Sequence, residues 1–75
     1  MSGKEFVVYV QLLGEGTICY RPTTAIEISS GIYQIEATDD YDDDDETWEF
    51  TPNTLVKCEY LTLAQGVVFA AVKLA

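Results

Sequence analysis

Residues 5–13 read EFVVYVQLL, and this stretch decides the fold. Its phenylalanine, tyrosine and valines suit a pleated strand better than a helix. Alternation along a strand places Val8 and Val10 on one face and Val7 and Tyr9 on the other, so both faces carry apolar side chains. We therefore predict a strand over residues 5–13 that is covered on both sides for part of its length.

Clusters of turn-forming or acidic residues divide the rest of the chain into segments of strand length. The predicted strands span residues 5–13, 17–28, 32–37, 47–50, 55–63 and 67–74. Pro22 cannot donate a hydrogen bond to a strand ladder, so it predicts an edge, a bulge or a bend in the second strand. Five to six short strands in 75 residues predict an all-β fold, a small antiparallel SH3-like barrel in a single domain, 1–75. The predicted core consists of Phe6 or its opposite-face neighbours, with Val8, Val10, Ile18, Ile26, Ile35, Val56, Cys58 and Val68.

The composition argues against several classes of function. Hydrophobic residues make up 48% of the chain, which is too much for a disordered tail. Four basic residues against 13 acidic ones give a formal net charge of −9, so we expect neither a nucleic acid nor an anionic membrane as the partner. The chain has no histidine and is too short for a deep substrate pocket, so we expect no enzyme activity, no catalytic residue, no metal and no cofactor.

The sequence shows neither an export signal nor a membrane-spanning segment. The first apolar run is interrupted by Gln11 and Gly14, and the C-terminal apolar run is too short to cross a bilayer. We therefore expect a cytoplasmic protein in which Cys19 and Cys58 stay reduced and buried.

Residues 39–46 form an acidic tract, DDYDDDDE, that has three possible roles. Clustered carboxylates could bind a divalent cation, although an EF-hand loop starting at Asp40 would need glycine at Asp45 and glutamate at Thr51. The tract could also attract a basic partner, or it could be a solvated loop that keeps the protein soluble.

Aromatic residues flank this tract and suggest a peptide-binding surface. SH3-like barrels bind extended peptides on aromatic side chains between loops. The candidate partner-binding residues are Tyr33, Tyr41, Asp42, Asp43, Asp44, Asp45 and Trp48. Trp48 and Phe50 share one face of their strand, however, and such a face is more often the core, so a place for Trp48 in the core or as a lid of the barrel is favoured over the binding surface.

The C-terminal segment is apolar and carries no protective charge or proline between residues 67 and 72. It tolerates a helix, but its Val-Val-Phe start favours a strand. The small side chains of residues 68, 70 and 72 are expected to point inward, which turns Val67 and Phe69 outward. Tyr9 and Leu13 could cover Phe69 within the monomer; otherwise Val67 and Phe69 form the interface of a homodimer.

Three short motifs carry a likeness to other proteins: LLGEGT at residues 12–17, RP at residues 21–22 and WEFTP at residues 48–52. Together with their surroundings, over roughly residues 6–60, they resemble a group of small uncharacterised bacterial proteins. The resemblance implies an SH3-like barrel and carries no assigned activity. The run Asp42–Asp45 is more acidic than the pattern of that group requires, so a function of this run need not be shared.

These observations predict a small, non-catalytic protein-interaction module whose partner is another protein or a second copy of the chain. Two alternatives stay open. The chain could be an acidic inhibitor or immunity-type protein that neutralises a basic partner. It could also bind a divalent cation through the loop Asp39–Glu46.

Overall fold

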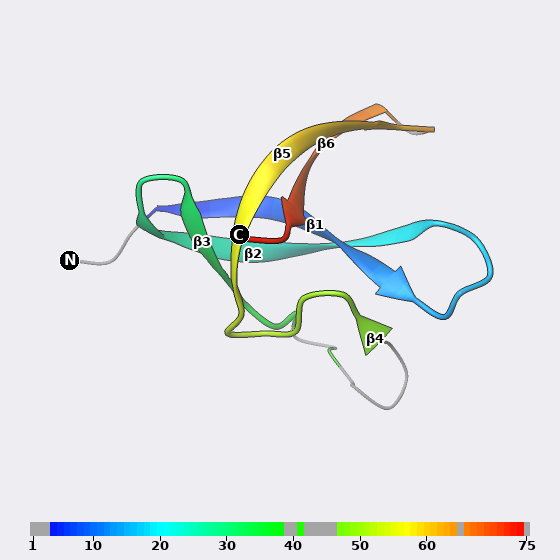
Figure 1. Cartoon of the computed structure of the whole chain (residues 1–75), viewed down its shortest axis with the longest axis horizontal. Helices are drawn as coiled ribbons and strands as arrows, with labels where there is room; N and C mark the ends of the chain where they lie inside the picture. Colours follow the sequence, from blue (N-terminus) through cyan, green and yellow to red (C-terminus); the bar gives the residue numbers. More distant parts are fainter. Residues whose placement is uncertain (1–3, 39–40, 42–46, 65, 75) are drawn as a thin grey trace.

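Six strands lie in the part of the chain that the structure, a computed structural model, describes: residues 4–38, 41, 47–64 and 66–74 (Figure 1). The strands are β1 (Glu5–Leu13), β2 (Cys19–Ser29), β3 (Ile32–Ile35), β4 (Thr47–Trp48), β5 (Leu55–Leu63) and β6 (Gly66–Val72). No helix occurs among the described residues, so the all-β prediction is confirmed. The strands β1 and β5 have the predicted bounds, whereas β3 and β4 end two residues earlier than predicted.

Five strands close into a barrel, and the sixth lies outside it. The strands β1, β2, β3, β5 and β6 each pair with the next one in antiparallel fashion, and β6 returns to β1. The short β4 pairs with the end of β1, where Leu12 lies opposite Trp48. The predicted small barrel of five to six strands is therefore confirmed.

The pair that closes the barrel is parallel, in contrast to the other four. Neighbouring strands of a meander alternate in direction, so the first and the last of five strands must run the same way. Tyr9 of β1 lies opposite Ala70 of β6 at this closure, whereas β1 and β2 pair along the whole stretch from Glu5 to Leu12. Because parallel pairing is also slightly weaker per residue, the seam between β1 and β6 is the weakest ladder of the barrel.

The core is made largely of side chains that alternate along the strands. Its buried members are Val8, Val10, Ala25, Tyr33, Ile35, Trp48, Val56 and Ala71, and the partly buried side chains packed against them are Phe6, Leu12, Tyr41, Phe50, Cys58 and Phe69. The core positions predicted for Val8, Val10, Ile35 and Val56 are confirmed. Val68 is also buried, but it lies outside this cluster.

Two predicted core residues, Ile18 and Ile26, stay out of the core. Ile18 lies before the first residue of β2 and is 74% exposed, so its prediction is wrong. Ile26 is only partly buried, because the register turns Ala25 inward in its place. The inner row of β2 also contains Thr23, whose hydroxyl donates a hydrogen bond to the Glu36 carbonyl at 2.6 Å and so satisfies its polar atom.

Pro22 lies within β2, which is one continuous strand of 11 residues. On one side it faces Tyr9 of β1. The other neighbour, β3, pairs only with residues Ala25 to Ser29 of β2, and the irregularity in that ladder lies between Glu27 and Ser29. Of the three predicted alternatives for Pro22, the edge position is therefore the observed one, where its missing N–H costs no ladder bond.

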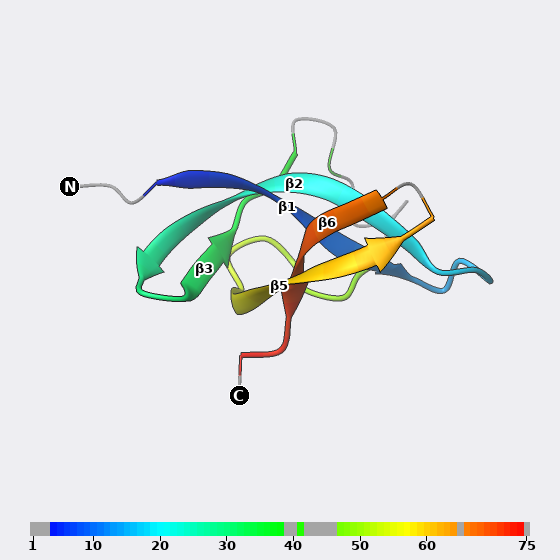
Figure 2. The same cartoon turned by 90° about the horizontal axis from the view of Figure 1, so that it is seen from above.

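The hairpin of β5 and β6 stands away from the other strands in Figure 1, and Figure 2 shows the same hairpin from above. The strand β3 has four residues and pairs with β5 only through Leu55 and Val56. Beyond that point, residues 57–63 of β5 pair with β6 alone. The mismatch in length between β3 and β5 therefore creates a two-stranded projection in which residues 57–63 of β5 have one unpaired edge. On the other side of the projection, β6 pairs with β1 only at Ala70.

Candidate functional site

Four aromatic rings from four different strands pack together where the β5–β6 hairpin leaves the barrel. The ring of Phe69 in β6 lies 4.9 Å from Tyr60 of β5, 5.7 Å from Tyr33 of β3 and 6.2 Å from Phe6 of β1, measured between centroids. Phe6 and Tyr33 also contact each other edge-to-face, at 5.3 Å and 87°. The edge-to-face contacts of Tyr33 with Phe6 and Phe69 are ones that aromatic quadrupoles favour, whereas Phe69 packs on Phe6 and Tyr60 in tilted arrangements. Phe69 therefore lies at the centre of the group.

This group of rings extends from the core to the surface. Tyr33 is 8% exposed, whereas Tyr60 is 75% exposed. Val67 is 66% exposed and, two residues before Phe69, lies on the same face of β6. We call Phe6, Tyr33, Tyr60, Val67 and Phe69 the aromatic face. It offers apolar surface for contact with another molecule and is anchored in the core at its buried end.

An acidic side chain, Glu27, lies beside the buried end of the aromatic face. It is opposite Tyr33 in the pairing of β2 with β3. One of its carboxylate oxygens accepts a hydrogen bond from the backbone N–H of Gly31 at 3.3 Å. Burial raises the pKa of Tyr33, and the negative charge of Glu27 adds to that rise. Glu27 therefore brings a negative potential to the aromatic face.

The thiol of Cys58 does not have the properties of a catalytic nucleophile. Burial raises the pKa of Cys58 to about 11, which keeps the thiol neutral at physiological pH. The thiolate is the reactive form, and catalytic cysteines have lowered pKa values. Cys58 and Cys19 are both free and only partly buried, so neither is as deeply buried as the sequence suggested.

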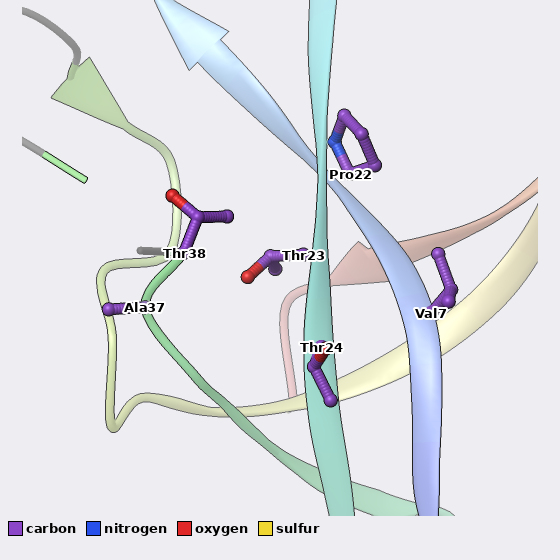
Figure 3. A pocket seen from close by; sticks show the side chains of 6 residues that line it. All are labelled: Val7, Pro22, Thr23, Thr24, Ala37 and Thr38. Carbon is purple, nitrogen blue, oxygen red and sulfur yellow. The ribbon is translucent and has the colours of Figure 1, made fainter. Parts of the chain in front are cut away.

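A shallow groove of about 370 Å³ lies between β2 and the segment that follows β3 (Figure 3). Its lining is formed by Val7, Pro22, Thr23, Thr24, Ala37 and Thr38. The hydroxyl of Thr23 is already engaged with Glu36, while the buried Thr38 Oγ1 has no hydrogen-bond partner among the described residues. The described side chains that line this groove are apolar or carry a hydroxyl group.

A second groove, of about 490 Å³, lies between the two hairpin ends. It is lined by Ile18, Cys19 and Tyr20 from the β1–β2 side and by Leu63 and Ala64 from the β5–β6 side. Among the described residues, this lining is mostly apolar and includes neither a carboxylate nor an amine. The thiol of Cys19 and the phenol of Tyr20 are the polar side-chain groups of this described lining.

The structure separates the aromatic residues that the sequence grouped around the acidic tract. Trp48 is 2% exposed and belongs to the core, and Tyr41 packs against it edge-to-face at 4.7 Å. Tyr33 packs instead on Phe6 and Phe69. The remaining candidates, Asp42, Asp43, Asp44 and Asp45, lie outside the described residues.

Phe69 faces the interior, and the expectation that it points outward is wrong. The row of β6 that contains Phe69 and Ala71 packs on the main core, while Val68 and Ala70 on the opposite face are buried as well. The cover for Phe69 comes from the rings of the aromatic face rather than from Tyr9 and Leu13. Of the two candidate interface residues, Phe69 is partly buried against these rings and Val67 is exposed, and their place in a homodimer interface stays a prediction.

No group of three or more histidine, cysteine, aspartate or glutamate side chains that could hold a metal ion occurs in the described part of the chain. Seven of the 13 acidic residues lie in the tract of residues 39–46, of which only Tyr41 is described, so the cation site suggested for the loop lies outside the described residues. Within the same described part, no helix is long and apolar enough to cross a membrane.

Sequence reasoning missed Tyr60 as a site residue, although the relevant signal was present. Alternation places Tyr60 on the same face of β5 as Val56 and Cys58, which suggests a core position. The core ends before Tyr60, however, because β3 is too short to follow β5 that far. The difference in length between the two predicted strands could have revealed the exposed aromatic position.

Comparison of the chain with models of known protein families, with curated proteins and with solved structures finds no significant match.

Proposed function

We propose that the chain is a non-catalytic protein-interaction module that binds its partner through the aromatic face. The observation that carries this proposal is the exposure of Tyr60 and Val67 beside the ring of Phe69. Tyrosine is enriched in protein interfaces because its rigid ring supplies a large contact area at a low cost in conformational entropy. The barrel anchors these side chains, so little further ordering is needed on binding.

The proposal also includes a relationship to other proteins, a location in the cell and the classes of partner that the chain does not bind. The motifs at residues 12–17, 21–22 and 48–52 support a relationship to the small bacterial proteins with SH3-like barrels. In the same proposal the module acts in the cytoplasm and binds neither nucleic acids nor membranes, which its net charge of −9 would disfavour.

Affinity capture with a matched control tests the proposed function. Tagged native chain, the double variant Tyr60→Ser/Val67→Ser and the control Ile18→Ser are each incubated with lysate of the native host. A captured protein is then purified and titrated against all three by calorimetry. Ile18 is as exposed as Tyr60 but lies outside the aromatic face. We expect the double variant alone to lose binding by at least tenfold.

The test requires that all three chains fold. Substitutions at exposed positions usually change stability by no more than about 0.5 kcal/mol, so unfolding midpoints should stay close together. If the captured protein binds the double variant as tightly as the native chain, or if the control loses binding equally, the aromatic face is not the binding surface.

A further inference from the structure

One edge of β5 has no neighbouring strand among the described residues. Residues 57–63 have β6 on one side, and no strand of the described residues pairs with their other side. Their backbone N–H and C=O groups on that side are therefore available to another strand. The stretch contains no proline, in contrast to the exposed edge of β2, where Pro22 removes a donor.

We propose that this edge accepts an extended, basic segment of a partner protein as an added strand, with an arginine or lysine side chain lying on the aromatic face near Glu27. The inference rests on the proposed function and names the chemistry of the partner. Strand addition supplies backbone hydrogen bonds for affinity, while the side chains on alternate positions supply specificity.

The orientation of the charged residues favours a cation at this place. Lys57 and Glu59 alternate with Cys58 and Tyr60, so they project from the opposite face of β5. On the aromatic face a cationic side chain would meet the rings of Tyr60 and Phe69 and the carboxylate of Glu27, and it would not be repelled by Lys57. An aromatic ring attracts a cation over its face, and a nearby carboxylate strengthens the attraction.

The overall charge distinguishes this partner from a second copy of the chain. A net charge of −9 attracts a basic segment over long distances and raises its rate of association. Two copies of the same chain, each with that charge, would instead repel each other when their β5 edges approach.

The length of the free edge sets the design of a probe. Seven residues of a strand extend over about 23 Å, at about 3.3 Å for each residue. The probe is therefore a capped seven-residue peptide that alternates threonine and arginine. Two controls match it: one has glutamate at each arginine position, and the other is the basic peptide with every second backbone amide methylated, which blocks strand pairing.

Binding is measured by titration of the ¹⁵N-labelled native chain, followed through the amide resonances. We expect the basic peptide to shift the amides of residues 57–63 and to bind at least tenfold more tightly than either control. Tyr60→Ser and Glu27→Gln should each weaken the basic peptide about fivefold. Val7→Ser should leave its affinity unchanged, because Val7 is exposed on β1 and lines a groove that contains no residue of β5. The glutamine variant keeps an oxygen for the hydrogen bond from Gly31.

Several results would overturn the inference. If the acidic peptide binds as tightly as the basic one, the partner segment need not be basic. If the methylated peptide binds as tightly, the segment does not bind as an added strand. Shifts confined to other parts of the chain, unaffected by Tyr60→Ser, would indicate general attraction to acidic residues. A native chain that sediments as a dimer, with amides of residues 57–63 shifting on dilution, would assign the edge to a second copy. If capture of a host protein still depends on Tyr60, the proposed function survives any of these failures.

Discussion

Replacing Ile35 by alanine tests the core that the structure describes. Ile35 lies in β3, is 0% exposed and is among the largest fully buried side chains. Truncation of a buried isoleucine to alanine costs about 2–5 kcal/mol, because transfer energy is lost and a cavity is left behind. The whole stability of a small domain is about 5–15 kcal/mol, and a chain of 75 residues belongs near the lower limit. Ile35→Ala should therefore lose a large part of its stability and unfold at a much lower urea concentration than the native chain.

Ile18 provides a matched control for this substitution. The same change there removes the same atoms from a side chain that is already mostly in water, so Ile18→Ala should alter stability by no more than about 0.5 kcal/mol. Urea unfolding of both variants can be followed by the fluorescence of Trp48, the only tryptophan, which is buried beside Tyr41. The slope of the transition should stay constant while the midpoint moves.

The comparison of the two variants is decisive because alternation in the sequence predicts the core for both isoleucines. Similar losses for Ile18→Ala and Ile35→Ala would mean that β2 begins before Cys19 and turns Ile18 inward. The inner rows assigned to β2 and β3 would then be refuted.

Three further predictions concern charge and protonation. Val10→Asp should be unfolded by circular dichroism, because it leaves an unpaired charge in the core; a folded, monodisperse variant would contradict the assignment of Val10 to the core. Replacing Asp42–Asp45 by asparagine should leave the melting temperature unchanged or slightly higher, because like-charge repulsion is relieved, and a clear decrease in metal-free buffer would count against this expectation. Burial raises the pKa of Cys58 from 9.0 to about 11, so between about pH 9 and pH 11 the unfolded chain releases a proton that the folded chain keeps, and stability should fall as the pH rises. The urea midpoint measured against pH should fall less in Cys58→Ala; a residual fall is expected from Tyr33, whose pKa is also raised, and an unchanged pH profile would contradict the role of Cys58.

The strands that could be predicted best are those whose ends are marked by turn-forming residues. Gly14 ends the alternation of β1, and the residues after Leu63 end that of β5, so both strands have the bounds that the pattern indicates. The number of strands and the small size of the chain then lead to a closed barrel, because closure removes exposed edges.

The inner row of β2 could not be predicted from hydrophobicity. The sequence offers Ile18 and Ile26 as the large apolar side chains, whereas the register places Thr23 and Ala25 opposite β1 residues that face the core. Small side chains leave room for the larger ones of the facing strands, and a hydrogen bond to Glu36 makes the buried threonine acceptable. Such complementarity depends on the side chains of the partner strand. The periodicity of a single segment carries no information about them.

The same dependence on partner strands moves the candidate binding surface from Phe69 to Tyr60. The sequence required a cover for Phe69 and offered a second copy of the chain as one source. Three rings from three other strands meet that requirement within the monomer, so Phe69→Lys would disturb packing against Phe6 and Tyr33 and would test folding as much as association. Tyr60 lies beyond the end of β3, where β5 loses a neighbour, so the same step in strand length exposes the ring and the edge beside it. A probe of binding therefore belongs at Tyr60, where a substitution alters the surface and leaves the core in place.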